Sequence, residues 1–407
     1  MNLKEIQDLI NKYGEAAWRV KEAGADGIEV HGAHGYLMSD FISPLTNKRG
    51  DAYGGELGGR MRFPMEVICT IREKVGADFP ILFRISADEM VPGGRNLEET
   101  TILCHLLVEA GVNALEISRG SFEALRWVVP PMGTPIAVNT QYAAEIRKNL
   151  RVPILVVGRI NDPIVAECIL EEGKADLVVM SRALLVDPDL PRKALSGSYE
   201  DIVPCIACNR CLESIMAGNP VTCSMNPAVG KEKNMVIVPA REPKTVLIVG
   251  AGPAGLEAAR VASLRGHRVT LYERTEKFGG QLNIASIPPA KQELIKAIKY
   301  FSTQIEKSGV KVEIGKEFTP ALIHQLKPDV VIIATGSTPI IPDIPGVNNP
   351  RVVTAIDVLS GKITIGNKVI IIGGGIVGSE TADYLSRLSV DVTLLEMLEN
   401  IATDMVI

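Results

Sequence analysis

The chain has 407 residues, with 43 Lys and Arg against 48 Asp and Glu and a formal net charge of −5. This length accommodates two to three domains with complete hydrophobic cores, and the absence of a basic excess argues against a nucleic-acid partner. With 46% apolar and only 22% charged residues the chain is not disordered, and it has no apolar run long enough to cross a bilayer. The composition therefore predicts a folded, cytoplasmic α/β protein that does not bind a membrane.

The first two hundred residues alternate between a helical apolar period and short apolar runs. Each run follows a helix that ends near a glycine, as in AGADGIEV and AGVNALEI, which is typical of parallel βα units. We expect helices at 2–23, 60–75, 97–110, 140–149 and 162–172, and strands at 27–30, 81–86, 114–118, 154–158 and 177–180. Five strands fit either an open sheet or the last five units of a (βα)8 barrel. We favour the barrel, with three units before Met1, because the chain opens on a helix that no strand precedes.

Four of the seven cysteines lie close together in the segment PCIACNRCLESIMAGNPVTCSMNP. Their spacing is C-x2-C-x2-C-x11-C, formed by Cys205, Cys208, Cys211 and Cys223. Three thiolates within seven residues can surround one side of a [4Fe-4S] cluster, and a fourth can close the site. A structural zinc site usually takes two separated pairs, so zinc fits this grouping less well, and unrelated thiols or a disulfide fit least. The spacing predicts a cluster and leaves zinc as the alternative.

A nucleotide-binding pattern begins at Thr245 with TVLIVGAGPAGLEAARVASLRGHRVTLYER. Gly250, Gly252 and Gly255 form G-x-G-x-x-G between an expected strand and an expected helix, and Glu273 follows 23 residues after Gly250. The glycines let the backbone approach a pyrophosphate at the helix N-terminus, and an acid about 20 residues on accepts a hydrogen bond from a ribose hydroxyl. The strand, helix and acid together make this far more specific than the glycines alone.

The same pattern recurs in KVIIIGGGIVGSETADYLSRLSVDVTLLEM. Gly373, Gly375 and Gly378 occupy the glycine positions, and Glu396 again follows 23 residues after the first glycine. Two dinucleotides are therefore predicted. Because Glu396 would repel a 2′-phosphate and no Arg follows it, the second module favours NADH over NADPH. The chain ends at Ile407 inside this module, so we also expect that it is cut short at the C-terminus.

Seven motifs follow one another along almost the whole chain. They are HGAHGYLMSDFISPLTNKRGDAYGG at 31–55, GRINDP at 158–163, MSRALLVDPDLP at 180–191, CIACNRC at 205–211, GAGPAG at 250–255, GGQLNIA at 279–285 and ATGSTP at 334–339. In this order they resemble the iron-sulfur flavoenzymes that join an old yellow enzyme barrel to a disulfide-reductase-like tail. That family includes 2-enoate reductases, 2,4-dienoyl-CoA reductases and trimethylamine dehydrogenase.

The resemblance implies a division of the chain into four parts. Residues 1–200 would be the last five βα units of an FMN-binding TIM barrel, and 201–241 a linker carrying a [4Fe-4S] cluster. Residues 242–366 would begin a Rossmann-like FAD-binding domain, and 367–407 would begin an inserted NADH-binding domain. The expected cofactors are thus FMN, FAD, the cluster and NADH.

The expected catalytic residues are His31, His34 and Tyr36, which follow a strand at the end of a barrel where active sites are built. Two imidazoles can donate hydrogen bonds to a carbonyl or carboxylate oxygen as hydride reaches the β-carbon, and a tyrosine hydroxyl, protonated at pH 7, can give a proton to the α-carbon. The three residues match the simpler old yellow enzymes. Phe122 stands where a dienoyl-CoA reductase would have a further His, which weakens that assignment.

The resemblance also assigns the cofactor contacts. Arg84 and Arg159 would face FMN, with Gly158, Ser181 and Arg182 holding its phosphate. In the tail, Ala254, Glu273 and Gln281 would hold FAD, with 334–336 packed beside it. The remaining cysteines, Cys69, Cys104 and Cys168, fall on expected helices and are expected in the core.

We interpret the chain as part of an NADH-dependent ene-reductase, an oxidoreductase acting on CH–CH donors, whose substrate is a small-molecule 2-enoate or enoyl compound. Electrons would pass from NADH through FAD, the cluster and FMN. One alternative is an amine dehydrogenase of the trimethylamine dehydrogenase type, although only 4% of the residues are aromatic. The other is a non-catalytic electron-transfer flavoprotein. The sequence leaves a homo-oligomer open.

Overall fold

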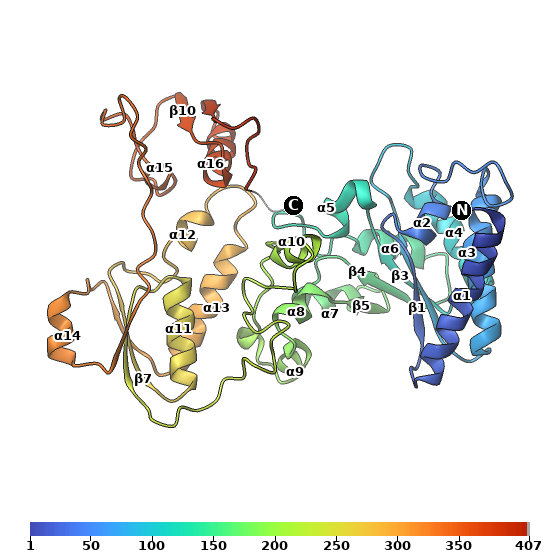
Figure 1. Ribbon diagram of the computed structural model, residues 1–407, viewed down its shortest axis with the longest axis horizontal. Helices are drawn as coiled ribbons and strands as arrows, with labels where there is room; N and C mark the ends of the chain where they lie inside the picture. Colours follow the sequence, from blue (N-terminus) through green and yellow to red (C-terminus); the bar gives the residue numbers. More distant parts are fainter. Residues whose placement is uncertain (405–407) are drawn as a thin grey trace. The chain divides into compact units, whose positions relative to one another are not determined.

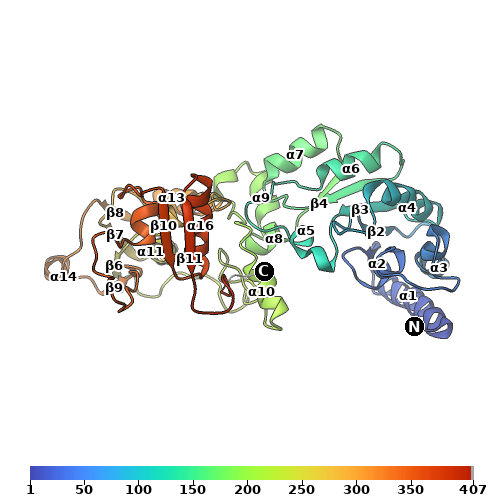
Figure 2. The same cartoon turned by 90° about the horizontal axis from the view of Figure 1, so that it is seen from above.

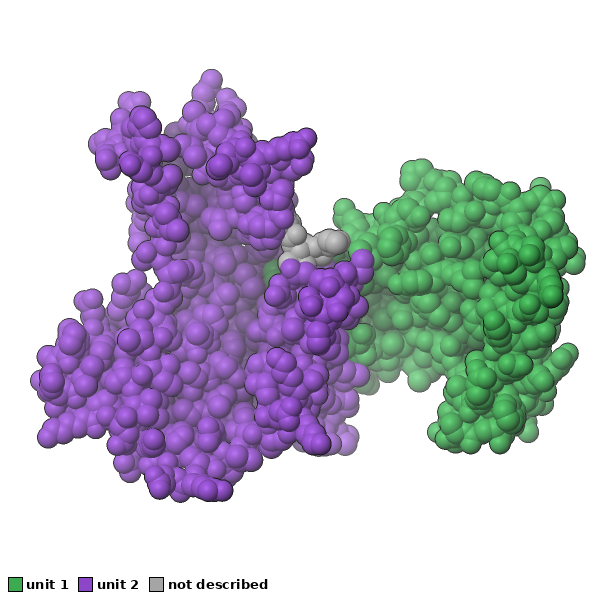
Figure 3. Space-filling model, viewed as in Figure 1, with its two compact units in different colours: residues 1–183 green, residues 184–407 purple. Residues whose placement is uncertain are grey.

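The computed structural model describes residues 1–404 of the chain. The chain divides into two compact units, Met1–Ala183 and Leu184–Ile407, which are coloured separately in Figure 3. Among the described residues, no helix is both long and apolar enough to cross a membrane.

Unit 1 contains a parallel five-stranded sheet whose order follows the chain, β1-β2-β3-β4-β5. The strands are β1 (Ile28–Gly32), β2 (Ile81–Ser86), β3 (Ala114–Ser118), β4 (Ile154–Val157) and β5 (Leu177–Val179). A doubly wound sheet would reverse its order at a switch point, whereas a (βα)8 barrel adds each strand beside the previous one. The sheet is therefore five consecutive units of a barrel.

The helices of unit 1 connect and cover these strands (Figures 1 and 2). They are α1 (Leu3–Glu22), α2 (Leu37–Ile42), α3 (Leu57–Val75), α4 (Leu97–Glu109), η1 (Phe122–Ala124), α5 (Leu125–Val128), α6 (Thr140–Arg147), α7 (Pro163–Glu171) and α8 (Arg182–Val186), the last of which continues into unit 2. The helix α1 begins with a capping box, in which Asn2 accepts from Glu5 N and Glu5 accepts from Asn2 N. The five expected strands and five expected helices are confirmed, while α2 and the short helices at 122–128 were not foreseen.

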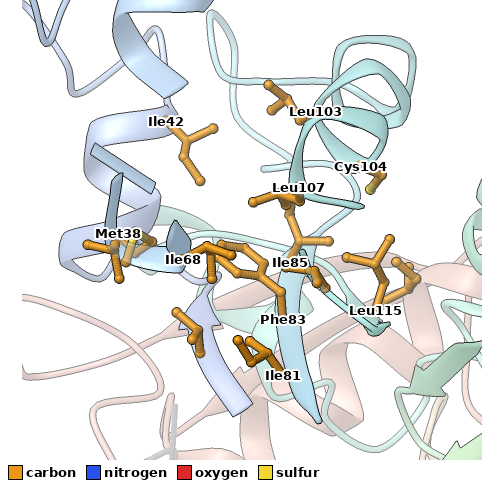
Figure 4. Packing of buried hydrophobic residues seen from close by; sticks show 14 of the residues in the cluster. Met38, Ile42, Ile68, Ile81, Phe83, Ile85, Leu103, Cys104, Leu107 and Leu115 are labelled. Atoms are coloured by element: carbon orange, nitrogen blue, oxygen red, sulfur yellow. The ribbon is translucent and has the colours of Figure 1, made fainter. Parts of the chain in front are cut away.

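The core of unit 1 lies between the helices and one face of the sheet (Figure 4). Ile81, Phe83 and Ile85 of β2 alternate with residues that point away from the helices, and all three are fully buried. Leu115 of β3 and Leu107 of α4 pack into the same cluster. Because strand side chains alternate between faces, the intervening residues line the interior face of the barrel.

Unit 2 begins with short helices, α9 (Leu190–Leu195), η2 (Tyr199–Asp201) and α10 (Arg210–Met216). The expected linker at 201–241 contains the helix α10, which was not predicted. Cys208 lies two residues before the start of α10, and Cys211 is the second residue of this helix.

The larger sheet of unit 2 has the order β8-β7-β6-β9, with all neighbours parallel. Its strands are β6 (Thr245–Val249), β7 (Arg268–Glu273), β8 (Lys311–Ile314) and β9 (Val330–Ile333), and its helices are α11 (Pro253–Leu264), α12 (Leu282–Ala285), α13 (Leu294–Lys307), α14 (Pro320–Leu326) and α15 (Ala355–Leu359). The strand order is that of a Rossmann half, with the first strand central. A second βαβ unit follows as β10 (Lys368–Ile372), α16 (Ile376–Arg387) and β11 (Asp391–Leu395), which lie side by side in Figure 2.

The three cysteines expected in the core do not share one environment. Cys104 on α4 is buried, as expected. Cys69 on α3 and Cys168 on α7 are exposed, so the prediction was wrong for these two. Each cysteine has apolar residues next to it in the sequence, but this local composition does not show which face of the helix the cysteine occupies.

Candidate functional site

The histidines and tyrosine of the HGAHGY motif gather at the carboxyl end of β1. The ring of His31 lies 5.2 Å from that of His34 and 5.3 Å from that of Tyr36, measured between ring centroids. Tyr36 is 55% exposed and stands at the N-cap of α2. The expected catalytic residues are thus close together, with the ring of His31 near both of the others.

His34 occupies an unusual backbone position, with φ of 69°. Its amide donates to Ser86 Oγ at 3.2 Å, and its Nε2 lies 2.7 Å from Ser118 Oγ. The pKa of His34 is lowered to about 3, mainly by burial and further by the charges of Arg84 and His31. The imidazole is therefore neutral at pH 7 and is held by Ser118, leaving Nδ1 as the ring atom that could reach a ligand.

Arg84 stands beside His31 in the register of β1 and β2. Burial lowers the pKa of His31 and Arg84 lowers it further, against an opposing effect of Glu29. The imidazole of His31 is therefore neutral near pH 7, and a neutral imidazole can donate one hydrogen bond. Arg84 pairs in turn with Glu116 of β3, at 3.0 Å between Nε and Oε1.

The interior face of the barrel also carries two carboxyl groups that the sequence analysis did not single out. The side chain of Glu116 on β3 is only 5% exposed, whereas Glu29 on β1 is exposed. Burial raises the pKa of Glu116, Arg84 lowers it, and the neighbouring Glu29 raises it again, to about 7 overall. A sequence signal existed, because each Glu lies within an otherwise apolar strand, in GIEV and ALEIS.

The residues expected to grip a phosphate lie after β4 and β5. Gly158 has φ of 134° and Arg159 has φ of 54°, so the chain turns sharply there. Arg159 Nη1 donates to the carbonyls of Pro131, at 3.0 Å, and Thr134, and Arg182 Nη1 donates to Pro130 at 3.0 Å. Both guanidiniums therefore position the loop at 130–134, and Ser181 is exposed beside Arg182. A phosphate contact by these residues stays a prediction.

The first nucleotide module has the geometry expected of a dinucleotide cradle. A Cβ on Gly255 would lie 1.8 Å from the carbonyl oxygen of Gly250, whereas a Cβ on Gly252 would meet nothing within 4 Å. The carboxylate of Glu273 accepts from Ala251 N at 2.7 Å and from Thr275 N at 2.8 Å. Burial raises the pKa of Glu273, but these hydrogen bonds outweigh it and hold the pKa below its usual value. The acid is thus ionised beside the glycine turn.

Two further contacts assemble this module. A Cβ on Gly250 would lie 2.4 Å from Ala334 O, so the A-T-G motif packs directly against the glycine turn. Gln281 Nε2 donates to Ser337 O at 2.6 Å. Ala254 is exposed at the N-terminus of α11, where its small side chain leaves the amide groups accessible.

The second module repeats this arrangement. A Cβ on Gly378 would lie 1.8 Å from Gly373 O, and Glu396 accepts from Gly374 N at 2.6 Å. Hydrogen bonds from Leu398 N and Gly374 N lower the pKa of Glu396. Above Gly375, the carboxylate of Asp404 accepts from Ile376 N at 2.9 Å. An anion thus occupies the helix N-terminus where a pyrophosphate would bind.

The four clustered cysteines lie in unit 2, and all are partly buried. The chain turns through left-handed conformations between them, at Ala207 with φ of 50° and at Asn209 with φ of 57°. Burial raises the pKa of Cys223, backbone hydrogen bonds lower it, and the thiols of Cys208 and Cys211 raise it again. Within residues 1–404, however, no three His, Cys, Asp or Glu side chains are grouped tightly enough to hold a metal ion. The cluster therefore stays a prediction.

Two family models match the chain. Residues 1–201 match the NADH:flavin oxidoreductase / NADH oxidase family, and residues 244–406 match the pyridine nucleotide-disulphide oxidoreductases. The segment between these matches contains the four clustered cysteines. The first match implies FMN, and the second implies FAD and a nicotinamide dinucleotide.

Several characterised proteins are similar over nearly the whole chain. An NADH oxidase of Thermoanaerobacter brockii is 43% identical over 100% of this chain and 63% of its own length. A cinnamate reductase of Clostridium sporogenes is 35% identical over 98% of this chain and 62% of its own. A 2-naphthoyl-CoA reductase in complex with 2-naphthoyl-CoA superposes with a TM-score of 0.95 at 36% identity, covering 100% of this chain and 62% of that one.

Amine-oxidising proteins match as well, among them an N,N-dimethylglycine/sarcosine dehydrogenase of Chromohalobacter salexigens, 34% identical over 94% of this chain and 58% of its own length. The chain spans about three fifths of the length of these relatives.

Proposed function

Because the chain belongs to the NADH:flavin oxidoreductase / NADH oxidase family in its 2-enoate reductase-like branch, we propose that it is part of an NADH-dependent reductase of activated carbon–carbon double bonds. The substrate is a small molecule in which the double bond is conjugated to a carboxylate or an acyl group. The observation that carries this proposal is the grouping of His31, His34 and Tyr36 at the carboxyl end of β1, beside Arg84.

The residues fit the cofactors that the family implies. Arg84 and His31 offer hydrogen-bond donors at the barrel face where a flavin would lie, and the two glycine turns leave space that a Cβ would fill. When bound, FMN supplies the hydride, while FAD, the [4Fe-4S] cluster and NADH supply the electrons that replace it. Arg84, Gly158, Arg159, Ser181 and Arg182 would hold FMN, and Cys205, Cys208, Cys211 and Cys223 would hold the cluster.

FAD would be held by Gly250, Gly252, Ala254, Gly255, Glu273 and Gln281, and NADH by Gly373, Gly375, Gly378 and Glu396. Glu396 points its carboxylate at the glycine turn, close to where a ribose would lie. A 2′-phosphate there would meet a negative charge, which favours NADH over NADPH. We place FMN binding at 1–200, the cluster at 201–241, FAD binding at 242–366 and the beginning of the NADH domain at 367–407.

The side chains of the barrel perform the substrate chemistry. The neutral imidazole of His31 donates a hydrogen bond to the substrate oxygen, and His34, oriented by Ser118, provides a second donor through Nδ1. These donors stabilise the negative charge that moves onto the oxygen as hydride reaches the β-carbon. Tyr36 then gives its hydroxyl proton to the α-carbon, and its exposed position allows solvent to restore that proton.

The amine dehydrogenase alternative is supported by the amine-oxidising relatives, but the charge near the site argues against it. A cationic amine would need open aromatic faces. Trp127, on the short helix α5 that follows β3, already has the guanidiniums of Arg119 and Arg126 over its ring, at 4.1 and 4.6 Å from the ring centroid. These positive charges would repel a protonated amine.

The test is a comparison of substrates with the whole protein, purified without oxygen and loaded with its flavins. We expect NADH-dependent reduction of cinnamate-type enoates or their thioesters, with NADPH much less effective. Turnover of a tertiary or secondary amine with no enoate reduction would establish the amine dehydrogenase instead. If NADH reduces the flavins but neither an enoate nor an amine is converted, the protein is a non-catalytic electron-transfer flavoprotein.

A further inference from the structure

The two nucleotide modules of unit 2 repeat one backbone contact beside the glycine turn. In the first module Gly279 N donates to Ala251 O at 2.9 Å, and in the second Ala402 N donates to Gly374 O at 2.7 Å, at the same spacing along the chain. Gly279 and Ala402 both have positive φ, of 104° and 55°. The segment that follows the second strand of each module therefore returns to the glycine turn in the same way.

The two modules differ in the side chain that stands two residues after this contact. In the first module it is Gln281, a neutral amide whose Nε2 donates to Ser337 O at 2.6 Å. In the second it is Asp404, whose Oδ1 and Oδ2 accept from Ile376 N at 2.9 and 3.2 Å. Pro253 takes the place of Ile376 in the first module and has no N–H to donate. An anion therefore lies at the N-terminus of α16, where the first module has a neutral side chain.

Asp404 lies in the space that a bound pyrophosphate would need. A Cβ on Gly375 would lie 3.1 Å from Asp404 Oδ2, whereas a Cβ on Gly252, the matching glycine of the first module, would meet nothing within 4 Å. Glycine at this position lets a pyrophosphate approach the backbone closely. The amide of Ile376 is among the first four of α16, which have no acceptor within the helix and attract anions. A phosphate group and the Asp404 carboxylate would therefore compete for one donor and repel each other.

We propose that Asp404 sets the affinity of the NADH site, because its carboxylate must leave the N-terminus of α16 when the pyrophosphate of the dinucleotide binds. This inference rests on the proposed function, in which the second module binds NADH. The modules then differ as their ligands do, since FAD is a resident cofactor whereas NADH is exchanged in every catalytic cycle. An internal anion lowers the apparent affinity, because only the fraction of molecules with Asp404 displaced can bind. It thereby favours release of the oxidised dinucleotide.

The test measures the binding of ADP-ribose to the whole flavin-loaded protein by calorimetry. ADP-ribose carries the pyrophosphate but no nicotinamide, so it binds without reducing the flavins. We expect Asp404→Asn, which gives this position a neutral amide like that of Gln281, to lower the Kd about three- to tenfold, the size expected for one charge at a helix N-terminus. Asp404→Ala should act in the same direction. Asp383→Asn removes the same charge from the exposed side of α16, where Asp383 pairs with Arg387, and should leave the Kd unchanged.

A second measurement, amide hydrogen exchange, tests the contact without any nucleotide. The amide of Ile376 should exchange faster in Asp404→Ala than in the unmodified protein, and equal exchange in the two would overturn the contact itself. Faster exchange together with an unchanged or higher Kd would show that Asp404 only caps the helix, and would overturn its competition with the pyrophosphate. If neither protein binds ADP-ribose, the NADH assignment of this module is wrong and the competition fails with it, while the exchange result still decides on the contact.

Discussion

At the scale of single residues, His34 links the active site to the stability of the barrel. Its pKa is lowered to about 3 mainly by burial, so the folded protein binds fewer protons than the unfolded chain between about pH 3 and the ordinary histidine value of 6.5. The free energy of unfolding must then rise with pH across this window and fall as the solution is acidified. Glu116 acts in the opposite direction. Its pKa is raised from the ordinary glutamate value of 4.5 to about 7, so stability falls as the pH rises through this range.

We therefore predict that His34→Gln removes part of the acid sensitivity. Denaturant unfolding of the unmodified protein and the variant, compared at pH 4 and 7, should show a smaller loss of stability on acidification in the variant. The difference should be on the order of a few kcal/mol, since one pKa unit corresponds to about 1.4 kcal/mol. Equal acid sensitivity of the two proteins would mean that His34 is not buried in its neutral form.

Tyr36 and His31 contact the substrate in the proposed function, so their replacement separates substrate chemistry from cofactor reduction. Tyr36→Phe removes only the hydroxyl, and we expect the rate of enoate reduction to fall by about 10² to 10⁴, the range typical of a lost general acid. FMN reduction by NADH should be unchanged. His31→Ala should weaken substrate binding as well. A variant at Tyr36 with full activity would assign the proton to another group.

The site was only partly predictable from the sequence, for reasons visible at these residues. His31, His34 and Tyr36 were found because a motif places them together, within six residues. Two further residues of the site lie on β3. Ser118 contacts His34 and is 84 residues further along the chain, and Glu116 pairs with Arg84. Their partners are set by strand register and barrel stagger, which no local pattern encodes.

At the scale of elements, both nucleotide modules need a glycine at the third position of the motif, where two backbone segments lie in close contact. In each, the third glycine lies against the carbonyl of the first, so a methyl group would need to displace backbone. The order of strand, glycine turn, helix and second strand was predicted for both modules, because apolar runs and glycine turns are local signals. The helix α10 was missed because its seven residues are too few for a clear helical period.

This geometry predicts that FAD binding and FAD reduction by NADH can be lost separately, each through one glycine substitution. Gly255→Ala should abolish FAD binding, because its Cβ would lie 1.8 Å from Gly250 O. Gly378→Ala should leave FAD bound but abolish its reduction by NADH. Gly366→Ala, where a Cβ would meet nothing within 4 Å, is the matched control and should retain both properties. Flavin absorbance and anaerobic titration with NADH measure the two effects. Loss of FAD in Gly378→Ala would show that the modules do not bind independently.

At the scale of the whole molecule, the cysteine segment lies in the chain between the residues that match the two family models. Its thiols are close enough for Cys208 and Cys211 to act on Cys223, yet no three are grouped as one metal ion requires within the described part of the chain. Four thiolates around one zinc would lie about 4 Å apart, given Zn–S bonds of about 2.3 Å. A cube of four irons needs a wider arrangement.

We predict that the whole protein, purified without oxygen, contains about four irons and an equal amount of acid-labile sulfide per chain. Cys223→Ser should lose this iron but keep FAD, because the residues of the FAD module that contact one another lie after the cysteine segment. NADH should then still reduce FAD in the variant, while FMN stays oxidised and enoate reduction stops. Zinc without sulfide, or normal enoate reduction in Cys223→Ser, would exclude the cluster as the connection between the two flavins.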